Sequence, residues 1–557
     1  MAKVSGSSLI VESLKKEGIK NLFILAGDHI LPVLDVMADF DFKFYDTRHE
    51  QSAVHMADAW NRITGEPGLS MVTTPGHANA IPGLANAFHH ESAVVHISGS
   101  AESSNLGMGA MQEIDQVGMA APVVKGAWQV PSVARIPEYI AMAFRKALSS
   151  RQGPVHLTIP IDLQKSLVDD VDVRRYEPDE YRPSNRLQAD RTNVDIAIKL
   201  LNAAEKPMVF AGTAAGYSSS PDQLREFIDI THLPLFTEDQ ARGLVSDDHP
   251  CCFGFGYLAL NEAAKKLREA DVVLLLGKKL DFTLNFGNTP PFKHGVKIIQ
   301  VDPSEADIGR SRGVSVPILG DVGSVLDQFI SEVPKYKWKK SSWLEELRLC
   351  RDKQDSDLET LAGTSTPMHA MSVHRKLREM IPADACLVFD GGDFNHFARS
   401  YYKALSPNKW LYLSTLGMIG TGVPVACAAK IAYPKNQVFL FTGDGSFGFN
   451  GMEYDLAVRH DLPFVGIMGN DGVWGIDYHI QIGLYGRPVA TTLRQSRYDQ
   501  VVQALGGHGE LVSRPDELEP AVKRSLQSGL PALVNVITKP AISALAAASI
   551  LKNKESV

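Results

Sequence analysis

Cysteine is scarce in this 557-residue sequence, and basic residues are not in excess. The five cysteines show no metal-ligand spacing, and two of them, Cys251 and Cys252, are adjacent. We therefore expect reduced thiols rather than a disulfide framework. The formal net charge is −8, which leaves no basic face for nucleic acid. These absences argue against a disulfide-stapled domain and against a nucleic-acid-binding protein.

Long apolar runs are also missing. No run approaches the ~18 residues that a membrane span requires, and the first residues lack the apolar core of a signal peptide. We therefore expect a cytoplasmic protein with no membrane partner. There is no repeat at solenoid spacing. No GxGxxG motif follows a first strand, which argues against a nucleotide-binding dehydrogenase.

What is present is an ordinary globular composition, with 44% hydrophobic and 22% charged residues. Apolar strands alternate with helical stretches in three blocks, and this alternation predicts α/β domains with doubly wound parallel sheets. The predicted domains are residues 1–166, 190–335 and 368–540. Polar segments, about 167–190 and 335–366, are predicted linkers, and the tail 541–557 is a terminal helix or a flexible end. The predicted strands are residues 21–25, 42–45, 69–72, 93–97, 155–159, 208–210, 272–276 and 296–301.

The most informative stretch is residues 441–475. An apolar strand, 437–442, leads into Gly443-Asp444-Gly445-Ser446, where glycines let backbone amides approach an anion and the aspartate faces a cation. After a helical segment, 451–460, a second apolar strand ends at Asn470 and Asp471. Because the ends of two parallel strands can lie side by side, we expect Asp444 and Asp471 to converge on one divalent ion that holds a diphosphate.

This spacing, GDG followed after 24 residues by Asn470, resembles the thiamin-diphosphate-binding motif. Three α/β units in this order resemble the thiamin-diphosphate enzymes of the acetolactate synthase and pyruvate decarboxylase type, over nearly the whole chain. The resemblance implies that the first domain binds the pyrimidine ring and the last the diphosphate. The central domain is then structural or binds a nucleotide, FAD or ADP. It also implies a homodimer or homotetramer with active sites between subunits.

The resemblance further implies a metal site. Asp444, Asp471 and the backbone carbonyl of Val473 would hold Mg²⁺. The family usually has asparagine where this chain has Asp471, and the extra carboxylate either tightens metal binding or repels the diphosphate. The implied cofactor-binding residues are Glu50, Gly417, Ile419, Gly443, Asp444, Gly445, Ser446, Asp471, Val473 and Trp474.

Three of these residues have specific implied roles. Glu50 follows a predicted strand, where the family's characteristic glutamate shares a proton with the pyrimidine nitrogen. Ile419, in the glycine-rich segment 416–424, falls at the position of the residue that wedges between the cofactor's two rings. The backbone carbonyl of Gly417 would take the proton of the 4′-amino group.

The substrate end is suggested by polar residues after the strands of the first domain. His29 follows the first strand, the place where parallel sheets bind ligands, and His77 and Gln112 lie in later loops. His29, with the segments DTRHE and IDQVGMAAP, resembles benzaldehyde lyase. That resemblance implies His29 and Gln112 as proton-relay and hydroxyl-binding groups.

Other segments resemble other members. Residues 277–287, together with Asp302, resemble the central domain of 2-hydroxyacyl-CoA lyases and oxalyl-CoA decarboxylases, in which Asp302 would bind a ribose hydroxyl. Residues 469–509 resemble actinobacterial acetolactate synthases.

The interpretation is a thiamin-diphosphate- and Mg²⁺-dependent enzyme that acts on a small carbonyl substrate. The first choice is a carbon–carbon lyase/carboligase for 2-hydroxy ketones and aldehydes. The alternatives are a 2-hydroxyacyl-CoA lyase and an acetolactate-synthase-type condensation of 2-oxo acids. A member that binds cofactor without turnover is disfavoured by the intact Glu50.

Overall fold

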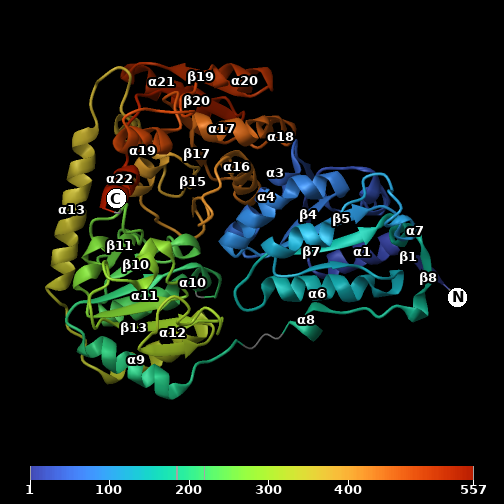
Figure 1. Cartoon of the computed structure of the whole chain (residues 1–557), viewed down its shortest axis with the longest axis horizontal. Coiled ribbons are helices and arrows are strands. Elements are labelled where there is room, and N and C mark those ends of the chain that lie inside the picture. The colour runs from blue at the N-terminus through green and yellow to red at the C-terminus, as the bar shows by residue number, and fades with distance from the viewer. Residues whose placement is uncertain (1, 183–185, 219, 556–557) are drawn as a thin grey trace. The chain divides into compact units, whose positions relative to one another are not determined.

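The computed structural model describes residues 2–182, 186–218 and 220–555. The chain forms two compact units. The first contains Met1–Asn185, Ser414–Pro434 and Asn450–Leu462, and the second contains Arg186–Leu413, Lys435–Phe449 and Pro463–Val557. Three six-stranded sheets, all parallel, carry the architecture, one in the first unit and two in the second (Figure 1). The predicted α/β class with parallel sheets is confirmed.

The sheet of the first unit has the strand order β3-β2-β4-β5-β7-β6. All residues of its inner strands β4, β5 and β7 are buried, the polar ones among their apolar residues included. The strands are β2 (Asn21–Ile24), β3 (Lys43–Asp46), β4 (Gly68–Val72), β5 (Val94–Ser100), β6 (Ala127–Gln129) and β7 (Val155–Pro160). The helices are α1 (Gly6–Lys16), α2 (Leu31–Met37), α3 (Glu50–Thr64), α4 (Thr74–His90), α5 (Gln116–Ala120), α6 (Ile136–Leu148) and α7 (Ile161–Lys165).

Helices cover both faces of this sheet. Leu9 and Leu14 of α1 and Phe144 of α6 belong to one buried cluster with the sheet, while α3 and α4 lie on the other face (Figure 1). The predicted linker after this domain is partly structured. Its first residues form β8 (Leu167–Asp169), which pairs antiparallel with β1 (Lys3–Ser5). A short helix α8 (Pro178–Tyr181) follows, and residues 183–185 of the predicted linker lie outside the described residues.

The central sheet has the order β11-β10-β9-β12-β13-β14. Its three predicted strands are present, but the sequence prediction missed the other three, which are only three or four residues long. The strands are β9 (Pro207–Ala211), β10 (Leu235–Thr237), β11 (Cys252–Phe255), β12 (Val272–Leu276), β13 (Lys297–Asp302) and β14 (Val316–Leu319). The helices are α9 (Arg191–Ala203), α10 (Thr213–Ser218), α11 (Pro221–Thr231) and α12 (Val322–Glu332).

Most of the segment predicted as a linker, residues 335–366, is helical. It forms the 19-residue helix α13 (Trp343–Leu361). Trp343, Leu344 and Leu347 are buried in the core of the central domain, and Trp343 Nε1 donates to the carbonyl of Pro207 at 3.1 Å. The charged residues that suggested a linker lie along the rest of a helix that is anchored by its first turns.

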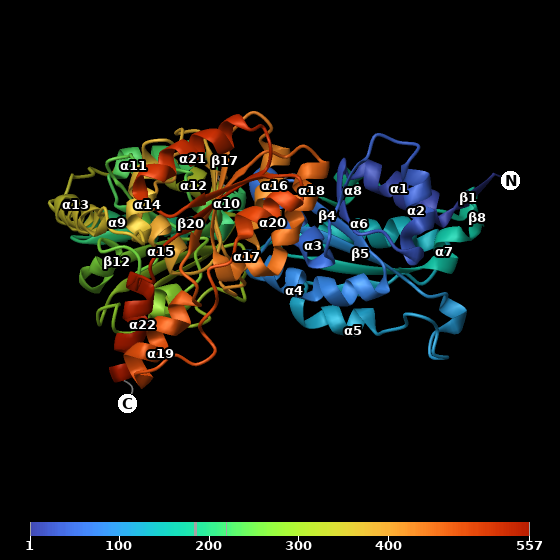
Figure 2. The same ribbon diagram turned by 90° about the horizontal axis from the view of Figure 1, so that it is seen from above.

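The third sheet has the order β16-β15-β17-β18-β20-β19. Helix α22 lies beside α19, which confirms the prediction of a terminal helix (Figure 2). The strands are β15 (Cys386–Phe389), β16 (Trp410–Leu411), β17 (Val438–Gly443), β18 (Val465–Asn470), β19 (His508–Val512) and β20 (Ala532–Ile537). The helices are α14 (Ala370–Arg378), α15 (Asp393–Tyr401), α16 (Gly422–Ala432), α17 (Asp444–Asn450), α18 (Tyr454–Arg459), α19 (Gly475–Tyr485), α20 (Tyr498–Ala504), α21 (Pro515–Gln527) and α22 (Ala544–Glu555).

Helices α16 and α18 belong to the first unit. Among the residues that the structure describes, no helix combines the length and the apolar character needed to cross a bilayer.

Candidate active site

Two aspartates emerge from neighbouring strand ends in the second unit. Strands β17 and β18 are paired in parallel, with Gly443 opposite Gly469. Asp444 follows β17 directly, and Asp471 follows β18 directly. The strand pairing that the sequence predicted is therefore present. It brings the two aspartates to the same edge of the sheet.

These two carboxyl groups have unusual electrostatics. Burial raises the pKa of Asp444 to about 6. Burial, together with the charge of Asp444, raises the pKa of Asp471 to about 7. Backbone N–H groups donate to both, from Gly472 to Asp444 at 3.1 Å and from Val473 to Asp471 at 3.2 Å. No lysine or arginine among the described residues forms an ion pair with either, so this oxygen donor set suits a hard divalent cation.

The glycine-rich segment around Asp444 is the start of a helix. Asp444 begins helix α17, so Gly445 and Ser446 lie in its first turn. The indole ring of Trp474 packs against Gly445 so closely that a β carbon there would lie 2.6 Å from the ring. The Ser446 hydroxyl donates to the carbonyl of Gly391 at 3.5 Å. Glycine at 445 is therefore required by the packing of Trp474.

Glu50, in the first unit, is the first residue of α3 and is buried. Its carboxylate accepts a hydrogen bond from Asn79 Nδ2 at 3.0 Å. Gly76 leaves room for it, because a β carbon at that position would lie 2.8 Å from Glu50 Cγ and Oε1. Helix α4 therefore supplies both the space and the amide that fix this acid.

Glu453 is a site residue that the sequence interpretation missed. Its carboxylate accepts hydrogen bonds from the backbone N–H groups of Arg48 and His49 at 3.1 Å. All three residues belong to the first unit. Glu453 therefore holds the turn immediately before Glu50, although about 400 residues separate the two in sequence.

The loop before α16 contains Gly417 and Ile419. Gly417 has φ 71°, a left-handed conformation that favours glycine. Its N–H donates to the carbonyl of Ser414 at 2.9 Å. The side chain of Ile419 is half-buried within the first unit. Glycine at 417 is thus explained by the turn, while the predicted cofactor contacts of this loop remain proposals.

His29 follows β2 and is held through its Nδ1 atom. Thr73 Oγ1 lies 3.0 Å and Thr74 Oγ1 3.2 Å from this nitrogen. Thr74 donates its proton to the carbonyl of Gly99 and accepts from Gln116 Nε2. With that proton on Gly99, Thr74 faces His29 as an acceptor, which favours the tautomer with the imidazole proton on Nδ1 and a basic Nε2. Burial lowers the pKa of His29, so the ring is neutral near pH 7.

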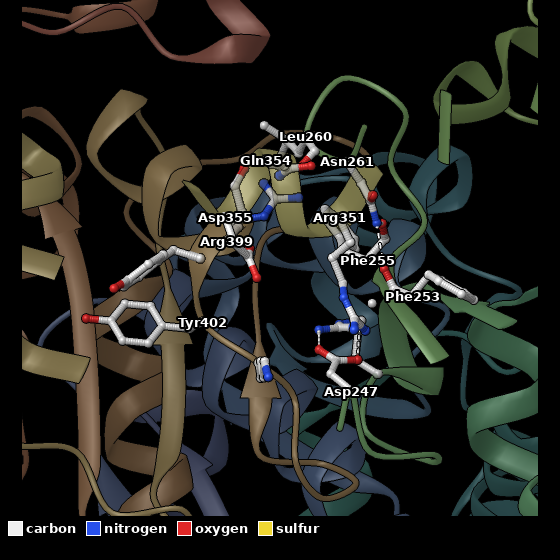
Figure 3. A pocket seen from close by; sticks show the side chains of 15 residues that line it. Asp247, Phe253, Phe255, Leu260, Asn261, Arg351, Gln354, Asp355, Arg399 and Tyr402 are labelled. Carbon is white, nitrogen blue, oxygen red and sulfur yellow. Dashed lines mark hydrogen bonds and ion pairs between the residues drawn. The ribbon is translucent and has the colours of Figure 1, made fainter. Parts of the chain in front are cut away.

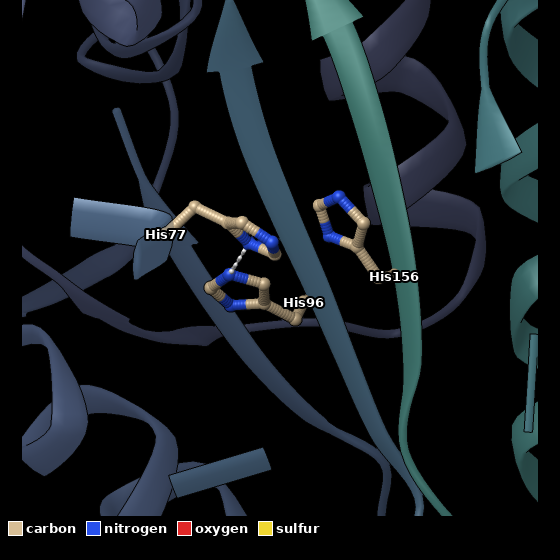
Figure 4. Close-up of side chains that lie close together, drawn as sticks. All are labelled: His77, His96 and His156. Carbon is tan, nitrogen blue, oxygen red and sulfur yellow. Dashed lines mark hydrogen bonds between the residues drawn. The ribbon is translucent and has the colours of Figure 1, made fainter. Parts of the chain in front are cut away.

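His77 does not lie in an accessible loop. It is fully buried beside His96 and His156 (Figure 4). Its Nε2 must donate to the carbonyl of Gln116 at 3.0 Å, so its Nδ1 accepts from His96 Nε2 at 3.1 Å, and His96 Nδ1 accepts from Ser70. Burial lowers the pKa of all three histidines, which keeps them neutral. We therefore remove His77 from the set of substrate-contacting residues.

The sequence interpretation selected Gln112, whereas in the structure Gln116 is the glutamine that is buried and hydrogen-bonded. Gln112 lies in a partly exposed loop with φ 61°, and no hydrogen bond of its side chain to another described residue is found. Gln116 is buried, accepts from Ser98 and Thr158, and donates to Thr74. No local pattern distinguishes the two glutamines, since the difference depends on which one faces the sheet.

Comparison with known proteins agrees with this geometry. Three family models match the chain: the thiamine pyrophosphate enzyme N-terminal TPP-binding domain over residues 4–119, the central domain over 194–329 and the C-terminal TPP-binding domain over 390–536. A probable acetolactate synthase of Mycobacterium bovis is 35% identical, covering 96% of each chain. The chain belongs to the thiamine pyrophosphate enzyme family. A 2-hydroxyacyl-CoA lyase of Arabidopsis thaliana is 30% identical, again covering 96% of each chain. Mouse 2-hydroxyacyl-CoA lyase 1 is 29% identical, covering 97% of this chain and 94% of the relative.

As a thiamine pyrophosphate (thiamin diphosphate) enzyme, the chain has its candidate residues in the two cofactor-binding domains. Glu50 and His29 lie within the N-terminal TPP-binding domain, and Asp444 and Asp471 lie within the C-terminal one. The central domain of this family member buries Asp302, which accepts from the backbone N–H of Ser304 at 2.9 Å.

Proposed function

We propose that this enzyme is a thiamin-diphosphate- and Mg²⁺-dependent lyase/carboligase. It would break or form the bond between a carbonyl carbon and the neighbouring hydroxyl-bearing carbon. Its substrates would be 2-hydroxy ketones, as in benzaldehyde lyase, or 2-hydroxyacyl thioesters, as the names of several relatives suggest. The observation that carries the proposal is His29, whose Nδ1 lies against the hydroxyls of Thr73 and Thr74, so that Nε2 would be the basic nitrogen toward the substrate.

The chain's residues fit the cofactor. Asp444, Asp471 and the backbone carbonyl of Val473 would hold Mg²⁺, since the paired acids have no cation of their own. Gly443, Gly445, Ser446 and Trp474 would surround the diphosphate. When bound, thiamin diphosphate supplies a nucleophilic carbon and stores the electrons released by bond cleavage.

On the first unit, Glu50 would exchange a proton with the ring nitrogen of the aminopyrimidine. Asn79 and the helix start keep its carboxylate in place for that exchange. Ile419 would press the two rings of the cofactor together, and the carbonyl of Gly417 would accept the proton of the 4′-amino group. Such active sites would lie between subunits of a homodimer or homotetramer.

His29 would act on the substrate. An aldehyde can leave only when the hydroxyl on its carbon loses a proton, and a neutral imidazole with a free Nε2 can accept that proton. In the ligation direction, the same nitrogen returns the proton to the new alkoxide. Gln112 would bind the substrate oxygen from the neighbouring loop.

The proposal is tested by incubating holoenzyme separately with benzoin, a 2-hydroxyacyl-CoA and pyruvate. We expect cleavage of a 2-hydroxy carbonyl compound, and His29→Ala should reduce it roughly 10²–10⁴-fold. Cofactor binding should be unchanged, and the exposed His294→Ala serves as the matched control. No cleavage of either 2-hydroxy compound by the wild type would refute the lyase assignment.

A second candidate is an acetolactate-synthase-type condensation of 2-oxo acids, favoured by the relatives of that name at 35% identity. Loss of CO₂ needs no base at a hydroxyl group. This function therefore predicts conversion of pyruvate to acetolactate that His29→Ala leaves unchanged. His29 would then be only a wall of the substrate pocket.

A further inference from the structure

A small cavity lies within the second unit, apart from the residues assigned above. Its volume is about 60 Å³, several times the 10–15 Å³ or so that one water molecule needs. Side chains from β11, α13, α15 and the segment after β10 surround it (Figure 3). Its polar and aromatic lining includes Arg242, Asp247, Phe255, Arg351, Asp355 and Arg399.

Arg399, on α15, is the unusual member of this lining. Its side chain is 8% exposed, and its Nε is buried without an acceptor. The guanidinium packs over the rings of Tyr412 and Phe255, at 4.3 and 4.9 Å from their centroids. Within the described part of the chain, no hydrogen bond or ion pair satisfies its five N–H donors. Burying an unpaired charge costs free energy, and an arginine does not avoid that cost by losing its proton under ordinary conditions.

Comparison with the other buried basic side chains shows that the lack of a carboxylate partner at Arg399 is exceptional. Five lysines and arginines are buried among the described residues, and four have carboxylate partners. Arg62 pairs with Asp58, Arg151 with Glu91, Arg242 with Asp247 and Lys278 with both Glu238 and Asp281. Arg399 alone has none. Since buried charges are normally paired, the guanidinium of Arg399 is left with unused hydrogen-bond donors.

The nearest acids do not fill that role. Glu238 and Asp239 influence Arg399 electrostatically, but Glu238 pairs with Lys278 at 3.1 Å and Asp239 accepts from Tyr412 and Thr213. The cavity wall is itself net cationic in character. Asp247 is engaged by Arg242 through two hydrogen bonds, and Asp355, whose pKa burial raises, faces the charges of Arg378, Arg351 and Lys403.

We propose that this cavity binds a small oxyanion, with the guanidinium of Arg399 as its principal partner and that of Arg351 as its second. A planar guanidinium presents paired donors that match the oxygens of phosphate or a carboxylate. Arg351 is partly exposed and uses one of its terminal nitrogens on the carbonyl of Cys252 at 3.2 Å. Its Nε pairs with Asp352 at 3.8 Å, which leaves the Nη2 donors of Arg351 for the anion. The bound anion joins α13, α15 and β11, so its binding stabilises the second unit.

The test uses the full-length enzyme after exhaustive dialysis against phosphate-free buffer. Equilibrium dialysis with radiolabelled inorganic phosphate measures binding, with chloride at equal ionic strength as competitor. Sulfate and acetate as further competitors distinguish a tetrahedral from a planar anion. We expect saturable phosphate binding and a rise in unfolding temperature that chloride does not reproduce.

Arg399→Met is the decisive variant, because methionine fills the space without the charge. It should weaken phosphate binding at least tenfold, by about 1.4 kcal/mol. Without phosphate, its unfolding temperature should equal or exceed that of the wild type, since an unpaired charge has been removed. Arg375→Met, at an exposed position, should bind phosphate as the wild type does.

Three results would overturn the proposal. These are no oxyanion binding to the wild type beyond the chloride control, unchanged binding in Arg399→Met, and equal loss in Arg375→Met. If Arg399→Met does not fold, Arg351→Gln at the mouth replaces it, with at least a threefold weakening expected. Unchanged binding in that variant would then count against the site.

Discussion

Two acidic regions of the molecule contrast in how their carboxylates are supported. Glu50, in the first unit, has an amide partner in Asn79 and stands at the start of a helix. For Asp444 and Asp471, in the second unit, burial raises both pKa values, the charge of Asp444 raises that of Asp471 further, and neither has a lysine or arginine partner among the described residues. A single supported carboxylate suits repeated proton exchange, whereas a pair of mutually repelling carboxylates suits a bound cation. Neutralising Glu50 should therefore impair turnover, whereas neutralising an aspartate of the pair should impair metal binding.

The largest effect is expected at Glu50. Glu50→Gln keeps an oxygen for the Asn79 amide but cannot share a proton with the cofactor, so turnover should fall by several orders of magnitude. Steady-state kinetics at saturating cofactor measures the loss, and circular dichroism checks the fold. Asn79→Ala is the companion variant, expected to lose less because the acid itself remains. Activity of Glu50→Gln within about tenfold of wild type, or 1.4 kcal/mol in barrier, would remove Glu50 from the mechanism.

A smaller effect, on binding rather than turnover, is expected at the paired aspartates. Chelation with EDTA should release thiamin diphosphate, and Asp444→Asn should weaken Mg²⁺ binding by roughly tenfold or more, or about 1.4 kcal/mol. Asp471→Asn restores the residue usual in the family and removes the repulsion between the two acids. It should keep activity and change mainly the metal affinity. Isothermal titration with Mg²⁺ measures both variants.

Two outcomes would contradict this assignment. One is full retention of cofactor after exhaustive chelation. The other is an Asp471→Asn enzyme that folds but is inactive, which would mean that the second carboxylate has a role that asparagine cannot fill.

The sequence could place these two acidic regions because their signals are local. Asp444 and Asp471 each follow an apolar strand, and parallel pairing brings strand ends together. Glu453 carries no such signal, because its partners Arg48 and His49 lie about 400 residues away and only folding joins them. Gln116 and Gln112 are chemically identical, and only the packing of α5 decides which is buried.

The secondary structure, too, was predictable only where its signal is local in the sequence. Buried inner strands such as β12 are continuous apolar runs, so the pattern finds them. Strand β10 has three residues, too few for any periodicity to show. Helix α13 is anchored by Trp343 and its neighbours, while its many charged residues give the composition of a linker. Tertiary burial, which composition does not report, decides such cases.

The two units also differ in their buried histidines, which gives the smallest of the expected effects. Burial lowers the pKa of His55 and His77 to about 4, and of His96 and His156 well below the usual value, all in the first unit. In the second unit His374 is comparable, with its pKa lowered to about 3. The first unit therefore has the larger set of histidines that must fold without a proton.

Between pH 7 and 5.5 the unfolded chain takes up protons on these histidines, because their unfolded pKa is near 6.5, while the folded chain does not. More protons on the unfolded state means that stability falls as pH falls. For His55 the loss is on the order of 1 kcal/mol at pH 5.5, and His55→Leu should remove that part of the pH dependence. Urea unfolding followed by pulse proteolysis, with fragments assigned to the first unit, measures it at both pH values. His294→Leu, at an exposed position, should keep the full wild-type difference. If His55→Leu also keeps the full stability difference between the two pH values, His55 already carries its proton in the folded protein. His55 would then make no contribution to the acid sensitivity of the first unit.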